Sequence, residues 1–323
     1  MRILTAGRLE ELTWDLPAPV LGLGTLDGVH LGHQELLARV RKRAAAVGGT
    51  PAVLTFARHP LEVVRPAEAP ALLTPLPLKL LLLERLGMQA AAVLDFSPAL
   101  ARLEAKEFAD RVLVHGLRVA GLCVGYDFGF GRGRRGTVDL LRQVAAEAGF
   151  WLEVLPPVTV DGQVVSSRAI RALLAAGQVE DAQRLLGRPY CLAGSVAPGA
   201  GRGMELGFPT ANLAVPDPAV LKDGVYAGRA LVRGAFHDAM MNLGSAPTFG
   251  AGGGRRLEIH LPGWREPLYG ERLIAFFLRR LRDERRFADG AALVRQLTRD
   301  REAAQAAWDA AAAMPWPDWA LQP

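Results

Sequence analysis

Two histidines and a group of glycines lie close together near the start of the chain. Residues 22–33 read GLGTLDGVHLGH and lead from an apolar stretch into a helical pattern. Glycines let a backbone approach a phosphate closely, and a helix N-terminus offers free N–H donors. His30 and His33 can both face such a site and donate hydrogen bonds to a phosphate that gains charge in the transition state. The pattern predicts nucleotide transfer without a covalent intermediate.

A hydroxyl and an amide stand two residues apart in the second half, after a glycine-rich stretch at residues 199–203. Thr210 and Asn212 belong to the sequence Pro-Thr-Ala-Asn, which we expect to form a bend. Both side chains offer oxygen ligands suited to Mg²⁺, which keeps phosphate and water as further ligands. The preceding glycines can fold over a triphosphate and donate N–H groups. Taken alone, such a turn is more often structural.

A glutamate interrupts an apolar strand pattern further along. Leu257, Ile259 and Leu261 alternate with Glu258 and His260, so the two polar residues share the face opposite the core. A carboxylate placed there can accept the proton of a substrate hydroxyl as that hydroxyl attacks a phosphate. The alternative is an ordinary exposed strand glutamate.

The first half must position the histidines, and it alternates apolar strands with amphipathic helices. We expect strands at residues 20–23, 52–56, 90–94, 121–124 and 151–154, and helices at 33–46, 78–86, 105–113 and 138–148. This alternation predicts a parallel sheet with helices on both faces. Ligands on such Rossmann-like α/β sheets bind beyond the carboxyl ends of the strands.

The second half changes character after two short helical patterns, at residues 169–175 and 179–186. We expect strands at residues 192–196, 224–232, 237–243, 257–261 and 273–279. Arg233-Gly234 is a plausible hairpin turn, and the pattern predicts a small antiparallel β-barrel. Residues 290–313 are alanine-rich and should form a terminal helix packed on the barrel. We therefore expect an α/β domain at residues 1–187 and a barrel domain at residues 188–323.

The bulk composition favours small phosphorylated ligands as partners. The chain has 323 residues and a formal net charge of +5, but acidic residues are interleaved with the basic ones. A basic stripe typical of nucleic-acid binding is not evident. We expect neither a nucleic-acid nor a membrane partner. Cys123 and Cys191 lie in apolar surroundings, which is typical of buried thiols in a reducing cytoplasm.

Several further segments carry a resemblance to a known family. They are Thr55–Pro60, Leu73-Thr74-Pro75 with Lys79, Val124–Gly131, Ser166–Arg171 and Leu186–Tyr190 in the first part, and Gly207–Asn212, Asn242-Leu243-Gly244, Pro247-Thr248-Phe249 and the Glu258 strand in the second. With the His-x-Gly-His segment, the chain resembles bacterial bifunctional riboflavin kinase/FAD synthetases. The resemblance implies that ATP and Mg²⁺ are used to convert riboflavin to FMN, and that ATP is used again to convert FMN to FAD.

The resemblance also implies roles for residues of the α/β domain. Its nucleotide-binding residues would be Gly24, Asp27, Gly28, Gly32, His30 and His33, together with Asp127 in a loop that builds the nucleotide and flavin pocket. Arg171 would hold the triphosphate. His59 would line the same cleft, or it would serve the core or the surface.

In the barrel domain, Glu258 matches the family's catalytic base, and Thr210 and Asn212 match its metal-binding pair. Gly203, Gly207 and Asn242 would bind the nucleotide or the flavin. Arg282 and Phe287 would contact the flavin, or they would only pack the barrel against its helix.

The chain departs from the family pattern at a few positions. Arg168-Ala169 stands where the family has Thr-Arg, and Met204 stands where it usually has Arg. One alternative is therefore a riboflavin kinase whose adenylyltransferase module is weakened or inactive. A more remote alternative is a flavin- or nucleotide-sensing regulatory protein. The sequence does not predict the oligomeric state.

Overall fold

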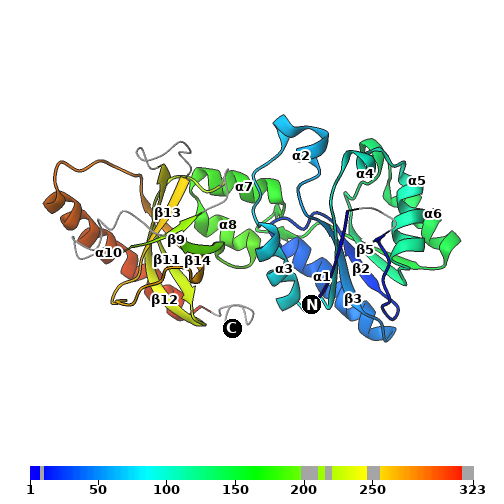
Figure 1. Cartoon of the computed structure of the whole chain (residues 1–323), viewed down its shortest axis with the longest axis horizontal. Coiled ribbons are helices and arrows are strands. Elements are labelled where there is room, and N and C mark those ends of the chain that lie inside the picture. The colour runs from blue at the N-terminus through cyan, green and yellow to red at the C-terminus, as the bar shows by residue number, and fades with distance from the viewer. Residues whose placement is uncertain (8–10, 198–209, 215–219, 246–254, 315–323) are drawn as a thin grey trace. The chain divides into compact units, whose positions relative to one another are not determined.

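The computed structural model describes residues 1–7, 11–197, 210–214, 220–245 and 255–314 (Figure 1). By their internal contacts, the residues divide into two compact units, Met1–Ser166 and Ser167–Pro323. Each unit is described by itself below.

The first unit is built on a six-stranded sheet in the order β1-β4-β3-β2-β5-β6, with every neighbouring pair parallel. The strands are β1 (Arg2–Ala6), β2 (Val20–Leu23), β3 (Pro51–Phe56), β4 (Ala90–Leu94), β5 (Gly121–Gly125) and β6 (Trp151–Leu155). The predicted parallel sheet is confirmed. The sequence analysis missed the edge strand β1, and a two-stranded hairpin of β7 (Thr159–Val160) and β8 (Gln163–Val164) follows the sheet.

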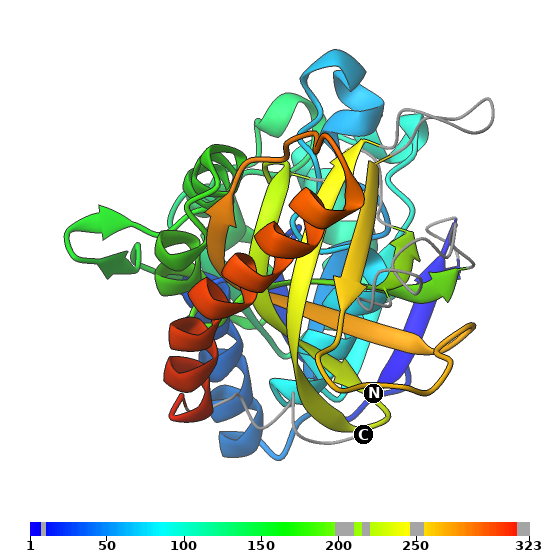
Figure 2. The same cartoon turned by 90° about the vertical axis from the view of Figure 1, so that its left-hand side faces the viewer.

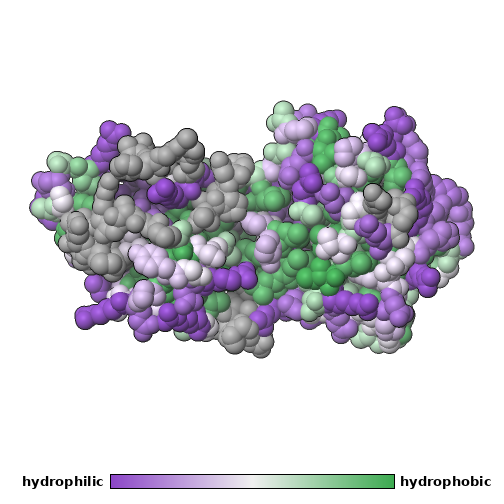
Figure 3. All heavy atoms as spheres, in the orientation of Figure 1, coloured by the Kyte–Doolittle hydropathy of each residue, from purple (hydrophilic) through white to green (hydrophobic). Residues whose placement is uncertain are grey.

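Helices cover this sheet. They are α1 (Leu31–Ala46), α2 (Leu61–Val64), α3 (Leu76–Arg85), α4 (Pro98–Arg102), α5 (Ala105–Phe108), which continues as the π-helical segment η3 (Ala109–Gly116), and α6 (Val138–Ala148). Helix α6 is amphipathic and buries Leu141, Val144 and Ala145. Figure 3 shows mostly polar residues on the edge of this unit where α5 and α6 lie.

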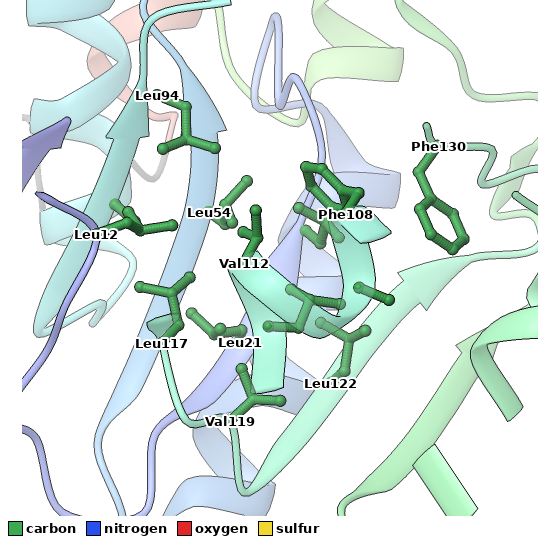
Figure 4. Packing of buried hydrophobic residues seen from close by; sticks show 14 of the residues in the cluster. Leu12, Leu21, Leu54, Leu94, Phe108, Val112, Leu117, Val119, Leu122 and Phe130 are labelled. Atoms are coloured by element: carbon green, nitrogen blue, oxygen red, sulfur yellow. The ribbon is translucent and has the colours of Figure 1, made fainter. Parts of the chain in front are cut away.

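The core of the first unit forms because alternate residues of each strand point to opposite faces of the sheet. Leu21 and Leu54 face Phe108 and Val112 of the helical segment on one side (Figure 4). On the other side, helix α1 packs against β2, β3 and β5. Helices thus cover both faces, as the alternation of elements predicts.

Strand β2 lies at a topological switch point. Its neighbours are β3, which follows it in the chain, and β5, which comes two strands later than β3. The segments after β2 and β5 therefore leave the same edge of the sheet side by side, which is where open α/β sheets bind ligands. These two segments carry the His-x-Gly-His motif and the glycine-rich 125–131 loop.

The second unit contains a closed antiparallel barrel in the order β10-β13-β12-β11-β14-β9. Its strands are β9 (Tyr190–Ala197), β10 (Thr210–Ala214), β11 (Gly224–Val232), β12 (Ala235–Ser245), β13 (Arg255–His260) and β14 (Arg272–Arg282). The predicted barrel is confirmed. The expected bend at Thr210 and Asn212 is wrong, because these residues form β10, whose pairing with β9 and β13 closes the barrel.

Among the described residues of this unit, the helices are α7 (Ser167–Ala176), α8 (Val179–Leu186) and α10 (Gly290–Ala312). Helix α8 packs against β14 and β9. The contact division falls before α7, earlier than the expected boundary at residues 187/188, because α7 packs on α8 and α8 packs on the barrel.

Helix α10 lies along the outside of the barrel strands (Figure 2). Its N-cap is Asp289, whose carboxylate accepts a hydrogen bond of 2.7 Å from the N–H of Ala292. Ala304, Ala307 and Trp308 pack on apolar residues of β11, β12 and β14. The indole Nε1 of Trp308 donates a hydrogen bond to the carbonyl of Gly228 at 3.0 Å. The ring is therefore buried between α10 and the barrel without leaving its N–H unpaired.

Both cysteines are buried free thiols, as predicted. Burial raises the pKa of Cys123 to about 12 and also raises that of Cys191, so both stay protonated. Among the described residues, none of the helices combines the length and apolar character needed to span a bilayer.

Replacing Trp308 tests how α10 is held. We expect Trp308→Ala to lower the free energy of unfolding by about 3–5 kcal/mol, because it leaves a cavity between helix and barrel. Trp308→Phe should cost less, since it keeps most of the packing, although it loses the hydrogen bond. Urea denaturation followed by circular dichroism measures both. Equal, negligible losses for the two variants would contradict this account.

Candidate active sites

The loop between β2 and α1 is held in a strained conformation. Leu26 and Val29 have positive φ values of 50° and 43°, which are rare for residues with a Cβ and rarest for a β-branched one. The buried carboxylate of Asp27 accepts hydrogen bonds from the N–H groups of Leu73 and Thr74 at 3.0–3.1 Å. In return, the Thr74 hydroxyl accepts from the N–H of Gly28 at 3.1 Å. Asp27 thus anchors the loop, and its contact with a nucleotide stays a prediction.

The two histidines lie together at the start of α1. His30 is the N-cap residue, and its Nδ1 accepts a long hydrogen bond of 3.4 Å from the N–H of His33. An accepting Nδ1 leaves the ring proton of a neutral His30 on Nε2, which can then donate. The two rings stack with centroids 3.6 Å apart. A Cβ at Gly32 would come within 3.2–3.3 Å of the His30 ring, so glycine makes room for the stack.

A buried lysine ties the ends of β2 and β3 together beside this loop. Lys79 donates hydrogen bonds to the carbonyls of Thr25 and Phe56 and to the hydroxyl of Thr55, at 3.0–3.2 Å. Burial lowers its pKa from 10.5 to about 8, and Asp27 opposes the shift in part. Lys79 also lines a small, open hollow together with Thr25, Asp27 and Thr74. His59 lines the same hollow, and both of its alternatives stay open.

The second loop of the switch point follows β5. Asp127 is exposed here, and its backbone carbonyl accepts a hydrogen bond of 3.1 Å from Arg134. Phe128 and Phe130 stack with centroids 5.6 Å apart. The loop thus presents an exposed acid at the sheet edge that also carries His30, while Phe130 is buried in the core and Phe128 packs against it. Their contact with nucleotide or flavin stays a prediction.

Arg171 lies on helix α7 of the second unit. Arg168 precedes it by three residues, which places both on neighbouring positions of one helix face. The helix buries Ile170 and Leu174. Binding of a triphosphate by Arg171 stays a prediction.

The barrel brings its predicted site residues into one row. Asn212 of β10 pairs with Glu258 of β13, and Glu258 pairs with Asn242 of β12. Directly paired residues of neighbouring strands point to the same face, with Cβ atoms about 4.5–5.5 Å apart. Thr210 pairs with His260 in the next row and shares that face. Gly203 and Gly207 lie outside the described residues.

Arg282 forms a salt bridge with helix α10. Its Nε and Nη2 donate to both carboxylate oxygens of Asp300, at 2.7–3.1 Å, and its Nη1 donates to the carbonyl of Asp283. Asp300 is a buried residue of α10. The pair holds α10 to the end of β14, and a contact of Arg282 with the flavin stays a prediction. The guanidinium also lies 5.8 Å from the centroid of the Phe287 ring.

Sequence reasoning assigned no role to Lys79, Glu284 or Asp300. A weak signal was present for two of them, because Lys79 interrupts an apolar helix and Asp300 falls on the buried face of an alanine-rich one. Glu284, which accepts a hydrogen bond of 2.9 Å from Asn242, gives no such signal, because its partner is distant in sequence.

These features define a two-part enzyme of phosphate chemistry, with a nucleotide site on an α/β sheet and a carboxylate–amide row on a barrel. Family models match both parts: FAD synthetase at residues 13–169 and riboflavin kinase at residues 186–308.

Curated relatives match along most of their length. Proteins named bifunctional riboflavin kinase/FMN adenylyltransferase are 39% identical in Pseudomonas fluorescens, covering 89% of this chain and 92% of the relative, and 36% identical in Escherichia coli K12, covering 87% and 90%. A crystal structure titled macrolide-efflux protein, from Streptococcus pneumoniae, matches with a TM-score of 0.82 and 28% identity, covering 94% of this chain and 99% of that one. The chain belongs to the bifunctional riboflavin kinase/FMN adenylyltransferase family.

The lowered pKa of Lys79 predicts a pH-dependent stability. Between pH about 8 and 10.5 the unfolded chain holds more protons at this residue than the folded chain, so stability rises with pH across that window. The gain is at most about 1.4 kcal/mol per pH unit. We expect Lys79→Met to lack this rise. Urea denaturation of both proteins below and above pH 8 measures it, and parallel pH profiles would contradict the assignment.

Proposed function

We propose that Glu258 is the base of the riboflavin kinase reaction in this two-activity enzyme. The observation that carries the proposal is the row of Asn212, Glu258 and Asn242 on three neighbouring barrel strands. The terminal ribityl hydroxyl of riboflavin attacks the γ-phosphorus of ATP, and the bond from that phosphorus to the β,γ-bridging oxygen breaks. Glu258 takes the hydroxyl proton, and FMN and ADP are the products.

The donor set around Glu258 fits a magnesium ion. Thr210 and Asn212 alternate along β10 and share the face of Glu258, so a hydroxyl and an amide oxygen lie beside the carboxylate. These oxygen donors, two neutral and one charged, suit Mg²⁺, which keeps phosphate and water as further ligands. Mg²⁺ held there would neutralise charge on the transferring phosphate.

The α/β unit carries the second transfer. The FMN phosphate attacks the α-phosphorus of a second ATP, the bond to the α,β-bridging oxygen breaks, and FAD and pyrophosphate form. His30 donates from Nε2, and His33, stacked against it, stabilises the same developing charge. Gly24, Gly28 and Gly32 let the phosphates approach the loop.

The substrates and the thiols favour a cytoplasmic enzyme. Both cysteines are buried and free, which is compatible with a reducing compartment. Riboflavin, FMN and ATP account for the partners that the two sites require, without a nucleic-acid or membrane partner.

Replacing Glu258 separates the two activities. We expect Glu258→Ala to lower FMN formation from riboflavin by at least about 10²-fold, since proton transfer to a positioned base contributes on this scale. Conversion of supplied FMN to FAD should be unchanged. One time course of purified protein with ATP and Mg²⁺, resolving both flavins, measures this. Near-normal FMN formation would overturn the assignment.

Replacing His30 should have the opposite effect. We expect His30→Ala to lower FAD formation by about 10²-fold or more, because one donor to the developing charge is lost. FMN formation from riboflavin should stay normal. If the unchanged protein forms FMN but no FAD, the alternative of an inactive adenylyltransferase module would hold instead.

A further inference from the structure

Glu284 lies against a short segment of β12 that carries a predicted site residue. Its Oε1 accepts a hydrogen bond of 2.9 Å from Nδ2 of Asn242. Its carboxylate also occupies the space above Gly244, where a Cβ would clash with both carboxylate oxygens. Gly244 does not have a positive φ, so the glycine serves close approach rather than an unusual backbone conformation. Asn242 and Gly244 therefore form a cradle for Glu284.

The cradle fixes which way the Asn242 amide points. A carboxylate only accepts hydrogen bonds, so the amide nitrogen must face Glu284 and the amide oxygen must face away. That oxygen, Oδ1, is buried and has no hydrogen-bond partner within the described part of the chain. A buried acceptor without a donor is unfavourable, and such an atom calls for an explanation, such as a water, an ion or a functional role.

The position of Asn242 indicates what that donor is. Asn242 is the direct cross-strand neighbour of Glu258. A base beside it accepts a proton from a hydroxyl, so a substrate at this row carries hydroxyl groups within reach of Oδ1. Riboflavin carries several hydroxyls along its ribityl chain. This step rests on the proposed role of Glu258.

Glu284 is itself held in place. Two residues earlier, Arg282 forms its paired contact with the buried Asp300 of α10. The end of β14 is therefore anchored immediately before Glu284.

We propose that Glu284 is a positioning residue of the kinase site, which orients the Asn242 amide so that Oδ1 accepts a hydrogen bond from a ribityl hydroxyl of riboflavin. Glu284 acts through Asn242 and touches neither phosphate nor base. It therefore sets the affinity for the flavin side chain rather than the rate of phosphate transfer.

The test is the variant Glu284→Gln in the full-length chain. A glutamine keeps the shape but can donate as well as accept, so the Asn242 amide loses its fixed orientation. We expect the KM for riboflavin to rise about tenfold, the size expected for one lost hydrogen bond to substrate. The KM for ATP and kcat should stay within about threefold. Glu302→Gln, which changes an exposed glutamate of α10, is the matched control and should leave all three constants unchanged.

A second readout excludes a merely structural role. Lumiflavin has a methyl group in place of the ribityl chain, and its inhibition constant against riboflavin phosphorylation reports ring binding at the kinase site alone. We expect this constant to be the same in Glu284→Gln and the unchanged protein. An unchanged KM for riboflavin, or an equal weakening for riboflavin and lumiflavin, would overturn the proposal.

Gly244→Ala provides an independent approach, because the added methyl group displaces the flexible Glu284 side chain from the cradle. Its effect on the KM for riboflavin should match that of Glu284→Gln, and the double variant should be no worse than either single one. Additive effects would contradict a shared cause. These binding constants do not depend on which group is the base, so a failure of the Glu258 assignment remains distinguishable.

Discussion

The hydrogen bonds from the Leu73 and Thr74 backbone to the Asp27 carboxylate hold the loop on which the first site depends. Positive φ values at Leu26 and Val29 cost of order 1–3 kcal/mol each. Such a conformation persists only where several surrounding contacts hold the backbone in place. Burial of both side chains and the bonds to Asp27 supply that constraint. The strain is useful because the loop then enters α1 at His30, which caps the helix at a site suited to a phosphate.

The barrel holds its site residues in position without a strained loop. Closed antiparallel pairing sets which side chains become neighbours, and it places Asn212, Glu258 and Asn242 side by side although they are far apart in sequence. Strands are more precise supports than loops, which suits a base that must meet one hydroxyl. Both sites therefore achieve phosphate transfer by positioning and charge, one on a helix N-terminus and the other on a strand row.

The sequence predicts the helices and strands that show a periodic pattern of apolar residues. It misses strands that form only by pairing with segments distant in the sequence. Strand β10 is an example, because Pro-Thr-Ala-Asn has the composition of a turn and becomes a strand only through its partners β9 and β13. Edge strand β1 is short and partly exposed, and it pairs with β4 at the rim of the sheet. The histidines and Glu258 could be predicted because their types and spacing carry the chemistry. The contacts of Lys79 could not, since two of its three acceptors are backbone carbonyls that only the fold brings together.

Two glycines in the site motifs are needed for the same physical reason. A neighbouring side chain occupies the space that a Cβ would take, and the sequence context does not reveal this. Gly32 of His-x-Gly-His and Gly244 of Asn-x-Gly both lack the positive φ that usually explains a glycine in a motif. At each position a Cβ would meet a functional side chain instead, the His30 ring in one case and the Glu284 carboxylate in the other. Any larger residue would move that side chain before it moved the backbone. These glycines therefore determine where a neighbouring group sits, and the adjacent polar residue is oriented as a consequence.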